Sequence, residues 1–483
     1  MAKLLLINPN KWGRGITHIW ITSHTGILKK NNHSIKYFDS SFYSDWSVDE
    51  VGFNTNNRQY KPANYGAAVT YNKNSVQNDL QKDIDNFKPD FIFWSAISSH
   101  IHGEGEYVNI QNGYELVSNL RIPDNTTFVT GGLQATADPK LILDLMPKID
   151  IVIRGESEIV LLNLLNKFDE QKDIFDEPGI AYKKNNEILL TKRQNLISDL
   201  DILSPYDYTM FEDQVFIRPY NGELVRAVDY ELSRGCIYSC SYCVETVIQR
   251  YYDFNEITPN GAIKNNKSYL RNKSAKIIFQ EIKNLNKSLG IHLFRCQDTN
   301  FLTINRKVLM ELSELIDNSN LDIQLYIETR PEGINESSIE LLKKLKVDGV
   351  GMGVELSSQD FRESSLNRFA DHEKIIKAFD LLRKNNIRST SYNVIGFPDQ
   401  DEKSIISTIE FNKILNPDNI TVAYYSPYYG TDQHRKSVNR SLFNEYEYNV
   451  DGQLRSTAQD KLISKKLLNY YKENFHDLVR AKK

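Results

Sequence analysis

Short apolar runs recur along residues 1–165, and segments with helical periodicity separate them. Runs of four or five apolar residues bounded by turn residues suit strands that are buried on both faces of a sheet. Helices between such strands predict a doubly wound, Rossmann-like parallel sheet of the α/β class. The expected strands are residues 3–7, 34–38, 91–94, 127–130 and 151–153.

Ligands of such sheets bind beyond the carboxyl ends of the strands. Two residues at this edge, Gly131 and Gly132, lack side chains and would let a ligand approach the backbone closely. A tight turn explains the same pair of glycines equally well. The segments that follow the expected strands are residues 8–10, 95–98, 131–134 and 154–158.

Residues 166–222 read as a linker between two larger domains, because charged and irregular stretches dominate this part of the chain. The pair Asn185-Asn186 lies between two short apolar segments and predicts a hairpin turn. We therefore expect one small β-ribbon within the linker.

A second alternation of strands and helices over residues 223–435 predicts a partial (β/α)6 barrel of the TIM type. Asn335 and Asp371 precede two of the helical repeats, which makes them expected N-caps. The catalytic loops of such barrels gather at the carboxyl ends of the strands. The expected strands are residues 227–233, 291–297, 323–328, 348–354, 388–395 and 420–425.

The C-terminal segment, residues 436–483, carries apolar residues at helical spacing from about position 456 onward. This spacing predicts an amphipathic helix, which we expect to pack on the barrel.

Composition narrows the class of protein. The chain of 483 residues is 40% hydrophobic and 25% charged, which is ordinary for a globular protein. A net charge of −4 gives no reason to expect nucleic acid as a partner. No apolar run approaches the ~20 residues of a membrane-spanning helix, and the N-terminus lacks a signal-peptide pattern. These features, with few cysteines, predict a cytoplasmic protein.

Three of the four cysteines, Cys236, Cys240 and Cys243, lie on one short loop with the spacing C-x3-C-x2-C. Thiolates grouped this closely are typical ligands of a soft metal centre. A structural zinc site uses four ligands, whereas three thiolates suit a [4Fe–4S] cluster with one open iron. A zinc knuckle remains the alternative. The fourth, Cys296, lies in an apolar run and is expected to pack in the core.

With Tyr242 before its last cysteine, this loop resembles the signature of the radical S-adenosylmethionine (SAM) enzymes. The resemblance implies a [4Fe–4S] cluster on Cys236, Cys240 and Cys243, with SAM chelating the open iron. It also implies a reductant such as flavodoxin or ferredoxin, whose electron cleaves SAM to a 5'-deoxyadenosyl radical.

The N-terminal sheet resembles the cobalamin-binding domain that precedes the barrel in one branch of this family. The similarity is best in the turn at Gly131 and Gly132 and in the Arg-Gly-Glu-x-Glu loop of residues 154–158. The D-x-H-x-x-G motif that supplies a cobalt-ligating histidine is absent, and neither His18 nor His24 has its spacing. The resemblance thus implies cobalamin without a histidine ligand from that motif.

The same resemblance makes polar residues at the strand ends candidate SAM contacts. Asp298 is a candidate for the SAM amino group or a ribose hydroxyl, with helix capping as the alternative. Arg330 would pair with the SAM carboxylate and Glu328 with ribose hydroxyls, unless the two form a buried ion pair. Ile395 lies in the segment that meets adenine, and Tyr242 completes the set.

These features lead to one functional hypothesis and two alternatives. The first is a cobalamin-dependent radical SAM methyltransferase that acts on an unactivated carbon of a small-molecule metabolite. The second is a radical SAM enzyme that catalyses cyclisation, rearrangement or oxidation without methyl transfer. The third is a non-catalytic binding protein stabilised by zinc.

Overall fold

The computed structural model describes residues 1–47, 64–95, 110–425, 427–440 and 462–481. The chain divides into two compact units. The first comprises Met1–Glu50, Tyr65–Arg218 and Val247–Asp253, and the second comprises Val51–Asn64, Pro219–Thr246 and Phe254–Lys483. The segment that the sequence suggested as a linker, residues 166–222, thus lies almost wholly within the first unit.

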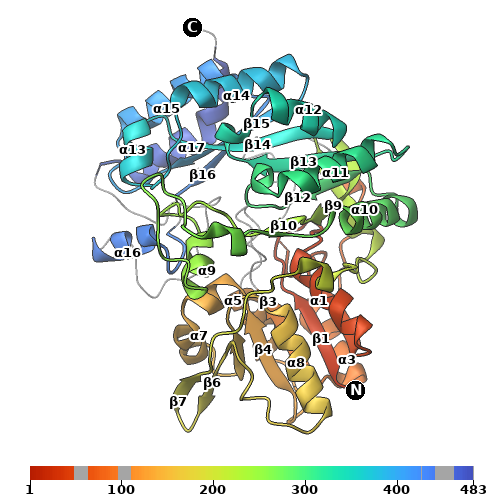
Figure 1. Cartoon of the computed structure of the whole chain (residues 1–483). Coiled ribbons are helices and arrows are strands. Elements are labelled where there is room, and N and C mark those ends of the chain that lie inside the picture. The colour runs from red at the N-terminus through yellow and green to blue at the C-terminus, as the bar shows by residue number, and fades with distance from the viewer. Residues whose placement is uncertain (48–63, 96–109, 426, 441–461, 482–483) are drawn as a thin grey trace. The chain divides into compact units, whose positions relative to one another are not determined.

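A seven-stranded sheet with the order β2-β1-β3-β4-β5-β6-β7 forms the centre of the first unit (Figure 1). Its first five strands are parallel, as the apolar runs predicted. The order reverses between β1 and β3, which is the switch point where doubly wound sheets bind ligands. The parallel strands are β1 Lys3–Asn8, β2 Ser34–Asp39, β3 Phe91–Ser95, β4 Thr127–Gly131 and β5 Ile151–Ile153.

Helices connect the parallel strands of this sheet, and the strand interiors are fully buried, as in Leu5, Ile92 and Val152. Burial of apolar side chains on strands of this kind is the main stabilising contribution to the unit. The helices are α1 Ile19–Lys30, α3 Val76–Phe87, α5 Ile110–Ser118, α6 Leu133–Ala137, α7 Pro139–Leu145 and α8 Glu158–Asp169.

The predicted β-ribbon is the hairpin of β6 (Ile180–Lys184) and β7 (Glu187–Leu190). Its turn residues, Asn185 and Asn186, both have positive φ angles, of 52° and 64°, as a tight two-residue hairpin requires. The hairpin pairs antiparallel with β5 and so extends the first sheet.

The second unit contains a curved sheet with the order β16-β15-β14-β13-β12-β9-β8. Strands β9 to β16 of this sheet are parallel and give the predicted partial barrel. They are β9 Glu223–Tyr230, β12 Leu293–Cys296, β13 Gln324–Thr329, β14 Val347–Glu355, β15 Arg388–Ile395 and β16 Asn419–Tyr424.

Strand β8 (Ile217–Tyr220) lies beside β9 at the edge of this sheet, where the sequence suggested a linker. The two strands are joined by Asn221 and Gly222, whose φ angles are 52° and 90°. Asn-Gly is the strongest short-range hairpin signal in a sequence, and it marks this turn.

Helices cover the outer face of the curved sheet (Figure 1). The predicted N-caps are confirmed: Asn335 accepts a hydrogen bond from the backbone of Ser338 in a capping box, and Asp371 accepts one from Glu373. Before the C-terminal helix, the helices that follow β11 (Arg271–Asn272) in this unit are α10 Ala275–Leu289, α11 Arg306–Asp317, α12 Glu336–Lys344, α13 Gln359–Ser364, α14 His372–Lys384, α15 Glu402–Leu415 and α16 Asp432–Asn439.

The inner face of the barrel is polar and aromatic. Strand β14 carries glycine at alternate positions, Gly349, Gly351 and Gly353, so these three share one face. Tyrosine side chains fill the space, since a Cβ at Gly351 would lie 2.6 Å from the hydroxyl of Tyr392 and 2.8 Å from that of Tyr326.

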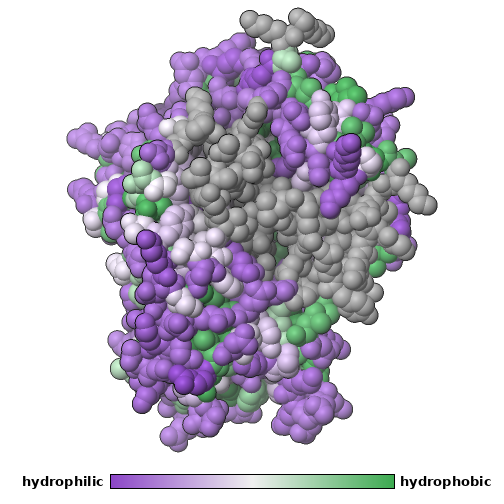
Figure 2. Space-filling view, turned by 180° about the vertical axis from the view of Figure 1, so that it is seen from behind, coloured by the Kyte–Doolittle hydropathy of each residue, from purple (hydrophilic) through white to green (hydrophobic). Residues whose placement is uncertain are grey.

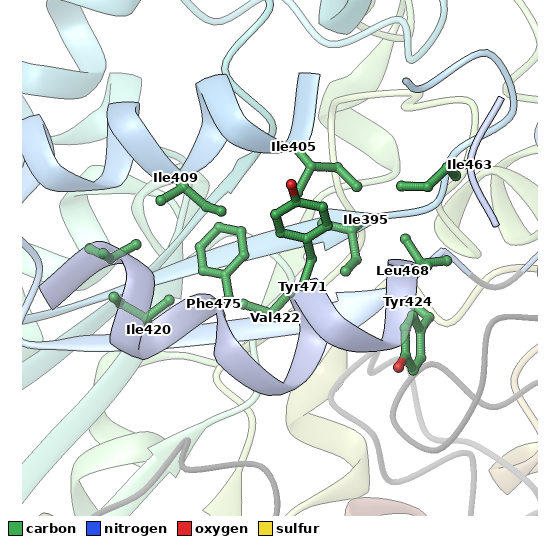
Figure 3. Close-up of a cluster of buried hydrophobic side chains, with 11 residues drawn as sticks. Ile395, Ile405, Ile409, Ile420, Val422, Tyr424, Ile463, Leu468, Tyr471 and Phe475 are labelled. Atoms are coloured by element: carbon green, nitrogen blue, oxygen red, sulfur yellow. The ribbon is translucent and has the colours of Figure 1, made fainter. Parts of the chain in front are cut away.

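The C-terminal helix α17 (Lys465–Arg480) packs on the barrel as predicted. Phe475, with no exposed surface, lies among side chains of α15 and strands β15 and β16 (Figure 3). The expected start of this helix near residue 456 lies outside the described residues.

Hydrophilic residues cover much of the face seen in Figure 2, and small hydrophobic areas interrupt them. Among the helices that the structure describes, none has the length and apolar character needed to cross a membrane.

Candidate functional site

The cysteine loop begins a few residues after the end of β9, at the carboxyl edge of the barrel. The two-residue strand β10 (Ser233–Arg234) pairs with β11 (Arg271–Asn272) and fixes the start of the loop. Gly235 follows with a φ of 95°, and a Cβ there would lie 2.6 Å from the carbonyl oxygen of Tyr269. Glycine is therefore required where the chain turns into the loop.

Hydrogen bonds hold the three cysteines in a compact turn. The backbone N–H of Cys243 donates to the carbonyl oxygen of Cys240 over 3.0 Å. The N–H of Cys236 donates to Glu245 Oε1 over 3.2 Å, and the Tyr269 hydroxyl donates to the same oxygen over 2.5 Å. Glu245 opens helix α9 (Glu245–Tyr251), so this carboxylate ties both ends of the loop together.

Burial dominates the electrostatics of the thiols. Cys236 and Cys240 are buried and Cys243 is half-buried, and all three are free thiols. Burial raises the pKa of Cys236 to about 12, and the neighbouring charge of Glu245 adds to the shift. Burial, followed by the charge of Cys240, raises the pKa of Cys243. A bound cation is what would favour the thiolate forms here.

Within the described residues, no group of three or more His, Cys, Asp or Glu side chains is arranged to hold a metal ion. The three thiols are candidate metal ligands because of their chemistry, their C-x3-C-x2-C spacing and their shared loop.

Arg330 follows the end of β13 and lies against the cysteine loop. Its guanidinium stacks on the ring of Tyr238, with the Cζ atom 3.7 Å from the ring centroid. Its Nη1 donates to the sulfur of Cys240 over 3.9 Å. Its Nε and Nη2 both donate to Glu332 Oε1, and Nη2 also donates to the carbonyl oxygen of Phe369. Most of its donors are thus engaged within the protein.

A second arginine, Arg368, lies near Cys240 and was not expected from the sequence. Its Nη2 donates to the carbonyl oxygen of Gly353 over 2.5 Å and lies 3.7 Å from Glu355 Oε1. Burial disfavours its charge, but Tyr242, Glu355 and Cys240 together raise its pKa above the usual value. Glu355 has a φ of 63°, a left-handed conformation that is uncommon for a residue other than glycine.

Tyr242 lies beside the apolar cluster of Leu356, Leu366, Phe397 and Tyr425. Its ring meets that of Phe397 edge-on, with 5.8 Å between the centroids. Its packing thus fixes the backbone between the second and third cysteines.

Asp298 accepts hydrogen bonds from the residues that follow the end of β9. Its Oδ1 accepts hydrogen bonds from the N–H and the hydroxyl of Ser233, at 2.6 and 2.5 Å, and from the N–H of Leu232 at 3.1 Å. It is 1% exposed, and burial raises its pKa to about 7. Through these bonds Asp298 holds the backbone that follows β9. The sequence had suggested a SAM contact or a helix cap for this residue, and neither describes these bonds.

Glu328 lies on the inner face of β13, close to the tyrosine pair. The Tyr392 hydroxyl donates to Glu328 Oε1 over 2.9 Å and shares a hydrogen bond of 2.7 Å with the Tyr326 hydroxyl. Among the described residues, Arg330 forms its ion pair with Glu332 and not with Glu328, with 2.6 Å between Nη2 and Glu332 Oε1.

Ile395 has no exposed surface and packs with Ile405, Ile409 and Phe475 in the outer core (Figure 3). Its carbonyl oxygen accepts a hydrogen bond from the N–H of Tyr425. The side chain of Ile395 is therefore engaged in packing between the barrel and α17.

In the first unit, Gly131 ends β4 and Gly132 precedes α6. Gly132 has a φ of 103° and a ψ of −165°, a conformation that is essentially restricted to glycine. A Cβ at Gly131 would make only ordinary contacts, at 3.6 Å. The requirement for glycine therefore lies at position 132, at the carboxyl edge of the sheet.

The loop of residues 154–158 is bound within its own unit. Gln194 Nε2 donates to the carbonyl oxygens of Arg154 and Glu156, and Glu158 Oε1 accepts from Ser23. His24 is also engaged through both ring nitrogens, with the carbonyl oxygen of Trp20 and the hydroxyl of Ser157. The expected ligand segment 95–98 extends beyond the described residues after Ser95, and residue 426 also lies outside them.

Residues 230–411 match the model of the radical SAM superfamily. An anaerobic magnesium-protoporphyrin IX monomethyl ester cyclase of Rubrivivax gelatinosus is 26% identical over 412 residues, which cover 82% of this chain and 68% of the cyclase.

Two solved structures are similar over nearly the whole chain. The first is the radical SAM methyltransferase TsrM from Kitasatospora setae with cobalamin and a [4Fe–4S] cluster bound. Its TM-score is 0.67 at 15% identity, with 91% of this chain and 75% of TsrM covered. The second is the cobalamin-dependent SAM radical enzyme OxsB, with a TM-score of 0.63 at 13% identity and 94% and 64% covered.

A radical SAM domain implies a [4Fe–4S] cluster and SAM as cofactors, in agreement with the thiol loop and its place on the barrel. Residues 230–411 therefore match a radical SAM domain, within a chain whose fold is similar to those of TsrM and OxsB.

Proposed function

We propose that this radical SAM enzyme is a cobalamin-dependent methyltransferase that acts on an unactivated carbon of a small-molecule substrate. The observation that carries the proposal is the loop of three buried thiols at the carboxyl edge of the barrel, in a chain whose other unit has a sheet of the 2-1-3-4-5 order. A sheet of this order binds its ligand at the switch point between β1 and β3.

Cys236, Cys240 and Cys243 are the proposed ligands of three irons of the cluster. The donor set fits because thiolates are the preferred ligands of iron–sulfur clusters and three of them leave one iron free for SAM. Two hydrogen bonds pre-organise the loop for this role. One joins the N–H of Cys243 to the carbonyl oxygen of Cys240, and the other joins the N–H of Cys236 to Glu245.

Cobalamin is the proposed ligand of the first unit. The glycine-only conformation of Gly132 leaves backbone without side chains at the ligand edge of the sheet. His24 is not a candidate cobalt ligand, since both its ring nitrogens are engaged within the protein. When bound, the cluster supplies the electron that cleaves SAM, and cobalamin supplies the methyl group.

The chain's own side chains provide positioning and exclusion of water. We propose that Glu328, held by Tyr392, binds the ribose hydroxyls of SAM on the inner face of the barrel. Tyr242 and Phe397 form an apolar wall behind the cysteine loop. A reductant such as flavodoxin or ferredoxin is the proposed electron donor.

A second candidate function is ring formation without methyl transfer. It is favoured by the match to the magnesium-protoporphyrin ester cyclase, which covers more than four fifths of this chain. Both functions use the same cluster and SAM site, so only the fate of the SAM methyl group separates them.

The test uses the full chain purified without oxygen and supplied with cobalamin. Iron, sulfide and cobalt are measured, and SAM with a deuterated methyl group is offered with candidate substrates and a low-potential reductant. We expect four irons and one cobalt per chain, and a product that carries the deuterated methyl group. Four irons without cobalt, or an unlabelled product, would favour the second function, and zinc without iron would exclude both.

A further inference from the structure

Arg330 lies beside Cys240, one of the three proposed ligands of the cluster. An effect of this arginine on the reduction potential of the cluster rests on the proposed function. The guanidinium has three fixed partners besides the cysteine. Glu332 Oε1 lies 3.1 Å from Nε and 2.6 Å from Nη2, and the carbonyl oxygen of Phe369 lies 2.8 Å from Nη2. The plane of the group is set by the ring of Tyr238, which belongs to the cysteine loop.

These contacts direct Nη1 at the sulfur of Cys240, 3.9 Å away. Arg330 is 6% exposed, so water screens its charge only weakly. A guanidinium has five N–H donors, and the named contacts use four of them. The one remaining donor does not suffice for the two parallel bonds of a bidentate arginine–carboxylate pair.

We infer that Arg330 raises the reduction potential of the cluster through its hydrogen bond to Cys240 and its charge, and that Glu332 orients and partly offsets this charge. Hydrogen bonds to the cluster sulfurs, net charge and exposure are the features by which proteins set such potentials. Reduction adds one negative charge to the cluster. A nearby cation therefore favours the reduced state and a nearby carboxylate disfavours it.

Glu332 carries its charge at neutral pH. Burial works against ionisation, but the charges of Arg330 and Arg368 lower its pKa below the usual value. Replacing Glu332 by Gln keeps an acceptor for the Arg330 fork and removes one negative charge. Replacing Arg330 by Gln removes the cation and the donor to Cys240. The two substitutions therefore have opposite expected effects on the potential.

The experiment is a redox titration of the cluster in the anaerobically purified full chain, followed by electron paramagnetic resonance. At a fixed potential, Arg330→Gln should lower the ratio of reduced to oxidised cluster about tenfold, which equals a shift of about 59 mV for a one-electron couple. Glu332→Gln should raise this ratio. The matched control is Arg383→Gln on the outer helix α14, where the arginine pairs with Asp380, and the potential should not change.

A purely structural role for Arg330 and Glu332 would move both potentials in the same direction or neither, and either result would overturn the inference. If Arg330→Gln fails to load iron, the potentials of Arg330→Lys and Glu332→Gln are measured instead. A Glu332→Gln potential at or below that of the wild type would overturn the inference that Arg330 raises the potential. Absence of a cluster from the wild-type protein would instead reject the proposed function.

Discussion

The hydroxyl of Tyr392 on β15 donates a hydrogen bond to Oε1 of Glu328 on β13 over 2.9 Å, across the intervening strand β14. Strand β14 lies between these residues, and Gly351 on it has no side chain to separate them. A hydroxyl from β15 therefore reaches a carboxylate on β13. The geometry fixes the orientation of the carboxylate that we propose for the SAM ribose.

We expect Tyr392→Phe to weaken SAM binding about fivefold to tenfold, since one hydrogen bond contributes about 1 kcal/mol. The ring would remain and only the donor to Glu328 would be lost. Isothermal titration calorimetry on the cluster-loaded protein measures the affinity. The matched control is Tyr220→Phe, because the Tyr220 hydroxyl donates to Asp348 in the same interior. An equal loss of affinity in both variants would argue against a specific role for the Glu328 contact.

Gly351→Ala tests the same arrangement through packing. The new Cβ would lie 2.6 Å from the Tyr392 hydroxyl and 2.8 Å from the Tyr326 hydroxyl, so both tyrosines must move. We expect lower thermal stability and a loss of SAM affinity at least as large as that of Tyr392→Phe. Unchanged stability and affinity would show that the inner face tolerates the methyl group without displacement of the tyrosines.

Cys240→Ala should abolish the cluster and with it the reductive cleavage of SAM, because one of three proposed ligands is lost. Cys296→Ala is the matched control. Cys296 is equally buried, but it lies on β12 and its thiol contacts the carbonyl oxygen of Phe294. Iron analysis and product detection should separate the two variants. Retained SAM cleavage in Cys240→Ala would reject this cysteine as a ligand.

The strands and the cysteine loop were predictable because each depends on local sequence. Buried parallel strands need continuous apolar runs, as in residues 91–94, and three cysteines within eight residues have few structural explanations. The N-caps Asn335 and Asp371 are equally local, since a cap requires only a short polar side chain before an apolar periodic segment.

The surroundings of the loop depend on tertiary contacts that leave no local pattern. Arg368 comes from an irregular segment between α13 and α14, and nothing in its neighbourhood indicates that it reaches Gly353 and Glu355. Asp298 likewise binds Ser233, 65 residues earlier in the chain. Such pairs follow from the order of the strands in the sheet and not from sequence spacing.

The alternation of side chains along β15 could have predicted which face of the strand carries Ile395. Side chains alternate between the two faces of a strand, and Tyr392 and Ile395 are three positions apart on β15. If Tyr392 points inward, Ile395 points outward, toward α17. The alternate glycines of β14 mark one face of that strand. Only the register between β14 and β15 shows which residues of β15 lie on the same face.

The C-terminal helix gives a prediction about stability. Phe475 has no exposed surface and packs against Ile405, Ile409 and Ile420. Truncating a buried phenylalanine costs about 3–5 kcal/mol, so Phe475→Ala should lower the free energy of unfolding by this amount in urea titrations. Tyr470 on the same helix is 49% exposed, and Tyr470→Ala should change stability by less than about 0.5 kcal/mol. Equal effects would show that α17 is not packed as described.

Asp298 predicts a dependence of stability on pH. Burial raises its pKa to about 7 in the folded protein, from an ordinary value of 3.8. The folded state therefore binds the proton more tightly than the unfolded state. The contribution to stability is fully present below pH 3.8 and is lost as pH rises through about 7. Between pH 6 and 8, linkage gives a loss of about 1 kcal/mol from this group.

Asp298→Asn should remove this loss, because the amide does not ionise and its oxygen still accepts hydrogen bonds from Ser233 and Leu232. Urea unfolding of the anaerobic protein at pH 6, 7 and 8 measures the slope for both proteins. The wild-type free energy of unfolding should fall more steeply with pH than that of the variant. Parallel pH profiles would mean that Asp298 ionises at its ordinary pKa in the folded chain, which would require water or a cation to reach a side chain that is 1% exposed here.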